Sequence, residues 1–144
     1  MPSSSSERIT TKYTPYKAVL RCDIGHLHSD LGAISQVFER DDERESITPG
    51  GGRMYLSYFE IYAKDSTDTG NFSYLPSDIK RRIWEEVFNL KCLFLEHEKP
   101  EVVMNLVKHP FSVEKRCGLY KSYLEPSGYD VMHDSTTIWV MRKQ

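Results

Sequence analysis

The chain has 144 residues, of which 39% are apolar and 12% aromatic, which is enough for the hydrophobic core of one domain. Its 19 basic and 21 acidic residues give a formal net charge of -2, which argues against a general electrostatic affinity for nucleic acid or anionic membranes. No apolar run approaches the roughly 20 residues that a membrane-spanning helix needs. We therefore expect one soluble α+β domain over residues 15–144, with no membrane partner.

The first residues are poor in aliphatic side chains. Residues 1–14 consist mostly of Ser, Thr and charged residues, so ordering them would cost entropy with little burial in return. We expect a flexible polar tail there. The same residues contain no apolar segment typical of a secretory signal, so we expect the protein to be cytoplasmic.

The next segments predict a strand, a helix and a loop. Residues 16–24 alternate around Val19 and Leu20 and predict a first strand that ends before Gly25. Asp30 is a suitable N-cap for a short helix over 31–38, because apolar residues recur there at helical spacing. The charged run 39–45 and the glycines 50–52 then predict a mobile surface loop.

Residues 53–108 predict a strand, the longest helix and another strand. Residues 53–64 alternate with bulk on both faces, which is typical of a central strand. The turn-rich segment 65–76 leads to a helix over 77–96, and Pro100 ends it. Residues 101–108 predict a buried strand. A right-handed crossover through this helix would make the two strands parallel neighbours.

The C-terminal third completes the expected fold. Ser112 is the expected N-cap of a second helix that ends at Leu124, and residues 129–132 and 137–141 predict two closing strands. The order of elements predicts an α+β domain with a mixed, mainly antiparallel sheet of about five to seven strands. A long and a shorter C-terminal helix would pack on that sheet.

Residues 113–120 read Val-Glu-Lys-Arg-Cys-Gly-Leu-Tyr, and Gly128 and Tyr129 follow them. Together with the order of elements over residues 53–144, this motif resembles the C-terminal part of the Gcn5-related N-acetyltransferase (GNAT) fold. The resemblance implies a splayed sheet that holds acetyl-CoA, with Tyr120 as the acid that protonates the departing thiolate. A carboxylate such as Glu60 would then act as the general base through water. As the alternative, Tyr120 is a core tyrosine on an amphipathic helix.

One feature of this sequence departs from that family. The family binds the CoA pyrophosphate with a basic, Gly-rich turn, whereas residues 65–78 contain three aspartates, one glycine and no basic residue. We therefore expect a non-catalytic binding or regulatory protein with a protein partner and no cofactor, such as a small viral or mobile-element protein acting on a host factor. The alternative is an atypical acetyl-CoA-dependent N-acetyltransferase.

Basic residues lie near the start of both predicted helices. They could form a basic rim for a nucleotide or RNA, and the rim comprises Lys80, Arg81, Arg82, Lys115 and Arg116, with Lys108 and His109 near them. The alternative is that they are solvated side chains paired with Glu85 and Glu86 along the helix. The balanced net charge favours the second interpretation.

Other chemistry-bearing residues give no strong pattern. Cys22, Cys92 and Cys117 are odd in number and widely separated, so we expect reduced, buried thiols. Cys117 could form a nucleophilic pair with His109 or His133, but the spacing does not favour one. His26 and His28 have no third ligand at metal-binding spacing, so we expect loop histidines and no metal.

Overall fold

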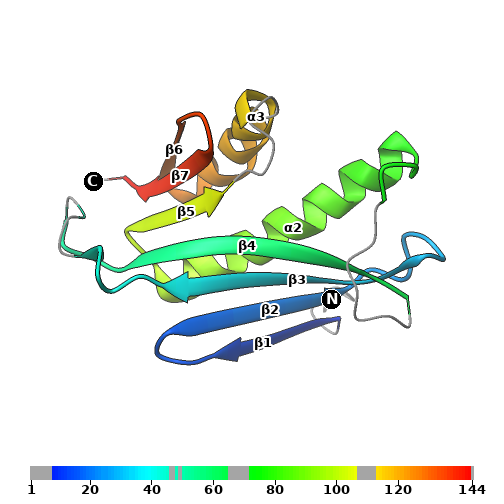
Figure 1. The fold of residues 1–144 in the computed structure, drawn as a ribbon, viewed down its shortest axis with the longest axis horizontal. Helices are drawn as coiled ribbons and strands as arrows, with labels where there is room; N and C mark the ends of the chain where they lie inside the picture. Colours follow the sequence, from blue (N-terminus) through cyan, green and yellow to red (C-terminus); the bar gives the residue numbers. More distant parts are fainter. Residues whose placement is uncertain (1–7, 46–47, 49, 65–71, 107–112, 144) are drawn as a thin grey trace.

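The computed structural model describes residues 8–45, 48, 50–64, 72–106 and 113–143 (Figure 1). In that part of the chain one sheet of seven strands has the order β1-β2-β3-β4-β5-β7-β6. All neighbours are antiparallel except β4 and β5, which are parallel. Two helices accompany the sheet, the longer α2 (Ser77–Glu98) and the shorter α3 (Val113–Leu124). The structure confirms the predicted fold class. The strands are β1 (Ile9–Tyr13), β2 (Lys17–Asp23), β3 (Leu31–Arg40), β4 (Met54–Ala63), β5 (Val102–Leu106), β6 (Tyr129–His133) and β7 (Thr137–Arg142).

Most of the predicted elements lie where the sequence placed them. β2 and β4 match the two predicted strands to within one or two residues. The crossover from β4 through α2 to β5 makes those strands parallel neighbours, as expected, and β6 and β7 form the predicted closing pair. Ser112, the expected N-cap of α3, and the turn at 65–71 lie outside the described residues.

The predicted helix over 31–38 is wrong, because these residues form the ten-residue strand β3. β3 lies between β2 and β4, and nearly all of its side chains are buried or half-buried. A strand that is buried on both faces is apolar at most positions, so its sequence also satisfies a helical spacing. The β-branched residues Ile34 and Val37 favour the extended conformation. β3 continues to Arg40, into the charged run that was expected to be a loop.

The expected polar tail also needs correction. Residues 9–13 of that segment form β1, which pairs antiparallel with β2 through a turn at Thr14. The segment contains Ile9, two threonines and Tyr13, all of which favour a strand. Tyr13 also stacks on His97 of α2 with ring centroids 4.0 Å apart. Ordering residues 9–13 costs conformational entropy, and the polar composition of the segment predicts little burial to offset it. Pairing with β2 and the contact with His97 offset that cost. Residues 1–7 of the expected tail lie outside the described residues.

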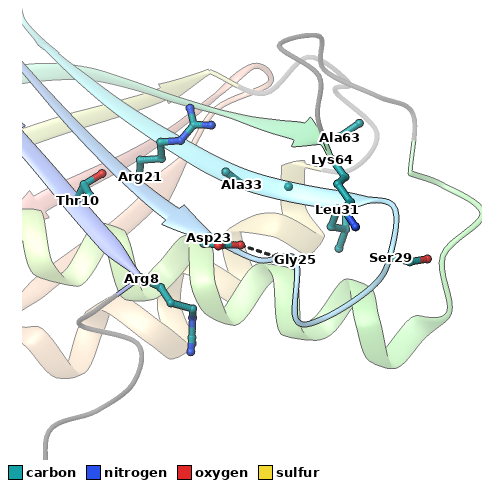
Figure 2. Close-up of a pocket in the computed structure, with 11 residues that line it drawn as sticks. Arg8, Thr10, Arg21, Asp23, Gly25, Ser29, Leu31, Ala33, Ala63 and Lys64 are labelled. Carbon is teal, nitrogen blue, oxygen red and sulfur yellow. Dashed lines mark hydrogen bonds between the residues drawn. The ribbon is translucent and has the colours of Figure 1, made fainter.

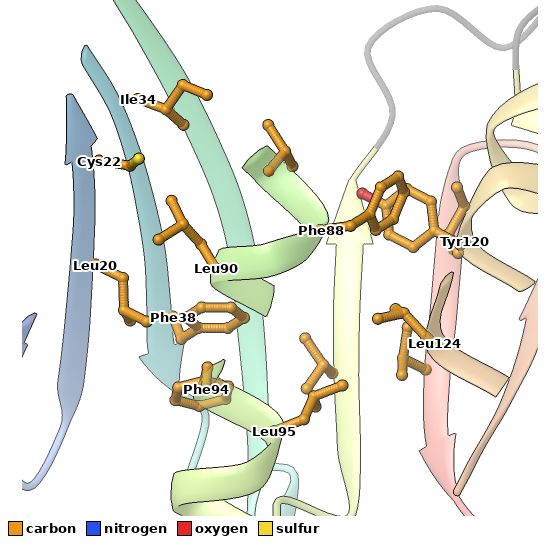
Figure 3. Close-up of a cluster of buried hydrophobic side chains, with 14 of the residues drawn as sticks. Leu20, Cys22, Ile34, Phe38, Phe88, Leu90, Phe94, Leu95, Tyr120 and Leu124 are labelled. Carbon is orange, nitrogen blue, oxygen red and sulfur yellow. The ribbon is translucent and has the colours of Figure 1, made fainter. Parts of the chain in front are cut away.

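Both helices cover the same face of the sheet, and the core lies between them and the strands (Figure 3). Phe38 of β3 and Phe94 of α2 stack with ring centroids 3.7 Å apart and an interplanar angle of 3°. Phe88 of α2 meets Tyr120 of α3 edge to face at 4.8 Å. A second, smaller apolar cluster around Met54, Val102 and Met104 lies on the other face. None of the helices in the described residues is long and apolar enough to cross a membrane.

The glycine loop before β4 is attached to the start of β5. The buried carboxylate of Glu101 accepts hydrogen bonds from the backbone N–H groups of Gly50 at 2.5 Å and Gly52 at 3.3 Å. A Cβ atom at Gly52 would lie 2.9 Å from the Cβ atom of Glu101, so this approach requires a glycine. The described part of the loop, which was expected to be mobile, is therefore anchored by a buried side chain.

Candidate functional site

The two parallel strands at the centre of the sheet separate after a short pairing. β5 pairs with β4 only from Met54 to Ser57, although β4 continues to Ala63. Among the described residues no strand pairs with the other edge of β4 from Tyr58 onward. At about 3.3 Å per residue this unpaired edge is about 20 Å long. Its backbone N–H and C=O groups can therefore bind an extended, amide-containing ligand, as a sheet edge binds an added strand.

Two adjoining pockets follow this edge on the helix face, and we call them together the β4 groove. The inner pocket, of about 250 Å³, lies where β4 and β5 separate, and the residues lining it include Ser57, Phe59, Lys91, Asn105, Arg116 and Tyr120. The outer pocket, also about 250 Å³, reaches the first turn of α2, and its lining includes Phe59, Ile61, Lys80, Ile83, Trp84 and Arg116. Phe59 and Arg116 border both pockets.

A buried lysine lies at the inner end of the groove. Lys91 of α2 is only 3% exposed, and its Nζ donates to Asn105 Oδ1 at 2.9 Å and to Ser57 Oγ at 3.3 Å. Its ammonium lies 5.2 Å from the ring centroid of Tyr120 and about 6 Å from those of Phe38 and Phe59. The three rings and two neutral oxygens therefore surround the charge in place of water.

No carboxylate compensates this charge within the described part of the chain, because none forms an ion pair with Lys91. Burial disfavours the charged form of a lysine, and it lowers the pKa of Lys91 from 10.5 to about 7. At neutral pH the ammonium and the free amine are therefore both populated. A strongly perturbed group inside a pocket is a feature of functional sites.

Two amide side chains fix the polar groups around Lys91. Gln36 donates through Nε2 to Ser57 Oγ at 2.7 Å and to the backbone oxygen of Tyr58 at 2.8 Å. Asn105 donates through Nδ2 to the backbone oxygens of Val103 and Ile138, which turns its own Oδ1 toward Lys91. The hydroxyl oxygen of Ser57 thus accepts two hydrogen bonds, from Gln36 and from Lys91. Its proton is left for a further acceptor.

The two catalytic residues expected under the acetyltransferase alternative lie on opposite faces of the sheet. Tyr120 is on the helix face, borders the inner pocket, and has its oxygen directed away from α3 (Figure 3). Burial raises the pKa of its hydroxyl well above the usual value, so the proton stays on the oxygen. Glu60 points to the other face, because β4 alternates and Phe59 packs on the core. There it accepts a hydrogen bond from Tyr62 at 2.6 Å.

The structure separates the expected basic rim into groove and surface residues. Lys80 and Arg116 border the outer pocket, and the Arg116 guanidinium lies 5.6 Å from the ring centroid of Trp84. Arg81 is instead within 4.0 Å of Glu85 along the helix, as the alternative interpretation expected. The side chains of Arg82 and Lys115 are exposed and line neither pocket. Lys108 and His109 lie outside the described residues.

The cysteines and histidines do not form a site in the described residues. All three cysteines are free thiols, and burial raises the pKa of each. Cys22 also donates to Glu86 at 3.2 Å, which stabilises its protonated form further. His28 accepts the N–H of Asp30 at its Nδ1. No group of three metal-ligating side chains occurs in the described ranges, and His109 is not among them.

A larger hollow of about 750 Å³ lies at the end of β1 to β4 away from the inner pocket (Figure 2). Its charged side chains do not converge, since Arg8 and Arg21 point in different directions in Figure 2. Arg21 lies 5.3 Å from the ring centroid of Tyr62, and Asp23 accepts the N–H of Gly25 at 2.8 Å. The hollow is therefore a weaker candidate for a small-molecule site than the β4 groove.

Lys91, Ser57 and Asn105 were not among the site residues predicted from the sequence. One signal was available for Lys91, because it follows Val87 by four residues and precedes Phe94 by three, on the apolar face of the predicted helix. A charged residue on that face must be buried or must distort the packing. Ser57 and Asn105 carried no such signal, since a small polar residue in a strand is ordinary on either face.

Comparison with known proteins leaves the assignment to the geometry. A scan against protein-family models, a search of curated proteins and a search of solved structures each found no match to this chain.

Proposed function

We propose that the protein binds an acyl-CoA thioester, such as acetyl-CoA, in the β4 groove and transfers the acyl group to an amine. The observation that carries this proposal is the position of the groove, which runs along the unpaired edge of β4 from the start of α2 to Tyr120. This is the alternative of the sequence analysis, which favoured a non-catalytic protein because the turn before α2 is acidic.

The phosphates, the amide arm and the thioester of an acyl-CoA each find a suitable partner along the groove. Phosphates are attracted by the N-terminus of α2, which has no side-chain cap, and by Lys80 and Arg116. These two side chains supply the positive charge that the turn lacks. The amides of the CoA arm suit the backbone groups on the edge of β4 that no described strand pairs with, and Phe59 and Trp84 offer it apolar contact. The thioester then lies in the inner pocket beside Tyr120.

The pocket provides one of the two proton-transfer groups that acyl transfer uses. The amine nitrogen attacks the thioester carbonyl carbon, the C–N bond forms, the C–S bond breaks, and the thiolate takes the proton of the Tyr120 hydroxyl. The proton that the amine loses restores the hydroxyl through water. Since burial raises the pKa of Tyr120, its hydroxyl is protonated at neutral pH and a proton is present when the thiolate departs.

The position of Glu60 favours a second candidate, a non-catalytic binding protein with the same scaffold. Glu60 lies on the face opposite Tyr120 and is bonded to Tyr62, so among the described residues it does not act as a base in the inner pocket. The free edge of β4 would then bind an extended peptide of a partner protein.

Thermal denaturation with and without millimolar acetyl-CoA tests the proposal. A ligand at 100 times its dissociation constant adds about 2.7 kcal/mol to stability, which gives a measurable rise in Tm. A rise in Tm, with turnover that Tyr120→Phe reduces at unchanged acetyl-CoA binding, supports the acyltransferase. Lys121→Gln, an exposed change one residue along α3, serves as the control.

Two other outcomes separate the candidates. A rise in Tm without turnover on a panel of primary amines would favour the binding protein that keeps the ligand site. No change in Tm with CoA or acetyl-CoA would reject the acyl-CoA proposal altogether.

A further inference from the structure

The polar side chains that line the inner pocket offer several hydrogen-bond donors to a ligand. Lys91 has three N–H groups, and two of them are used by Ser57 and Asn105. Ser57 accepts from both Gln36 and Lys91, so only its proton remains available. The hydroxyl of Tyr120 has no hydrogen bond within the described residues and keeps its proton as the third donor.

The charge of the pocket has the same sign throughout. Two cationic side chains border it, Lys91 at the inner end and Arg116 at the boundary with the outer pocket, and no described lining residue is an aspartate or glutamate. A buried cation without a partner is costly. The polar neighbours of Lys91 solvate it only in part, since burial still lowers its pKa to about 7. An anionic ligand would remove the cost of burying the Lys91 charge, whereas the methyl group of an acetyl thioester would not.

We propose that the inner pocket binds a carboxylate, so that the acyl group of the thioester ends in one, as a succinyl group does. The carboxylate accepts hydrogen bonds from the third N–H of Lys91 and from the Ser57 hydroxyl. The claim that the carboxylate belongs to a thioester rests on the proposed function. The claim that the inner pocket binds a carboxylate does not depend on it. Four carbon atoms fit within a pocket of about 250 Å³.

The test compares two stable CoA thioethers that differ in one carboxylate, S-propyl-CoA and S-(3-carboxypropyl)-CoA, of which the second places its carboxylate as many bonds from sulfur as a succinyl group does. Their dissociation constants for the full chain are measured by calorimetry at pH 6.5, where most Lys91 side chains are charged. We expect the carboxylated probe to bind at least about tenfold more tightly, as is typical of a charge-assisted hydrogen bond. In Lys91→Met this ratio should fall to about one. In the control Lys121→Gln the ratio should stay as in the unchanged protein.

The ratio separates a ligand contact from a structural role of Lys91. Both probes meet the same folded protein, so a general loss of stability or of groove shape would weaken both and leave their ratio unchanged. If Lys91→Met does not fold, the ratio in the unchanged protein and the NMR signal of the Lys91 amino group during titration with succinate still decide the question.

The possible results distinguish this inference from the proposed function. Equal binding of the two thioethers would overturn the carboxylate site and leave acyl-CoA binding in place. Failure of both thioethers, with succinate binding that shifts the Lys91 signal, would reject acyl-CoA binding and support the carboxylate site. If neither thioether nor succinate binds, both proposals are rejected.

Discussion

Lys91 Nζ on α2 lies 2.9 Å from Asn105 Oδ1 on β5, although 14 residues separate the two in the sequence. The hydrogen bond crosses from the helix layer to the sheet at the point where β4 and β5 separate. It places a charged side chain inside the core, where the pairing of β4 with β5 has ended and no other strand among the described residues pairs with that edge of β4. The polar network and the inner pocket therefore share one cause, the short pairing of β4 with β5.

The first prediction concerns how Lys91 couples stability to pH. The folded-state pKa of Lys91 is lowered below its unfolded value, so the unfolded chain binds more protons between about pH 7 and 10.5. The destabilising effect of Lys91 is therefore full below about pH 7 and disappears as the pH rises toward 10.5. Relative to Lys91→Met, the unchanged protein should gain several kcal/mol in unfolding free energy between pH 7 and 10. Urea denaturation of both proteins measures this.

The difference in unfolding free energy between the unchanged protein and Lys91→Met cancels, to first order, the contributions of the other titrating groups. The groups near Lys91 are Cys92 on the same helix and Tyr120 and Arg116 on α3. If the difference in unfolding free energy stays constant between pH 7 and 10, Lys91 keeps its ordinary pKa in the folded protein.

The second prediction concerns the outer end of the groove. Lys80→Gln should weaken CoA binding several-fold at low salt and make the affinity less dependent on salt, because one cation near the phosphates is removed. Arg81→Gln is the matched control, since Arg81 pairs with Glu85 and does not border the groove. Calorimetry at two salt concentrations gives both quantities. Equal effects of the two substitutions would contradict the assigned position of the phosphates.

The third prediction concerns the stacked pair at the centre of the core. Phe94 is fully buried, and its ring stacks on that of Phe38. Phe94→Ala should lower the unfolding free energy by about 3–5 kcal/mol, because it removes apolar contact and leaves a cavity. Asn89→Ala on the exposed side of the same helix should change it by less than about 0.5 kcal/mol. Chemical denaturation would refute the central position of Phe94 if both variants lost the same small amount.

The fourth prediction concerns the glycines. Gly52→Ala should destabilise the protein by about 1–3 kcal/mol, since its Cβ atom would lie 2.9 Å from that of Glu101. Gly118→Ala should instead stabilise it by up to about 1 kcal/mol, because Gly118 is on the exposed side of α3 with open space around it. Melting curves of the two variants should therefore shift in opposite directions. A Tm of Gly52→Ala that is unchanged or raised would contradict the contact between Glu101 and the loop.

The limits of sequence-based prediction are clearest in two strands. β4 was predicted to within one residue, because its four aromatic residues favour a strand and turn-rich segments lie on both sides of it. Residues 31–38 predict a helix but belong to β3, because their side chains are buried on both faces and the apolar positions satisfy the helical and the strand periodicity at once. β1 was missed because its stability comes from pairing with β2, which composition does not report.

The candidate site shows the same division. Tyr120, Lys80 and Arg116 were found from the sequence, and the structure places all three along the β4 groove. Glu60, Arg82 and Lys115 were named for the same sites, but they do not border it. Local spacing fixes which side of an element a residue occupies. It does not say which of two sheet faces that side covers.

The amino-acid sequence by itself determined the order of most elements, the long helix and the parallel crossover, because each depends on local periodicity and on turn residues. Only the tertiary structure decided that β4 and β5 separate after Ser57 and that Lys91, Ser57 and Asn105 meet there. The physical reason is that hydrogen bonds among buried polar groups depend on the packing of a helix against two strands. That arrangement leaves no periodic pattern in any one of the three segments.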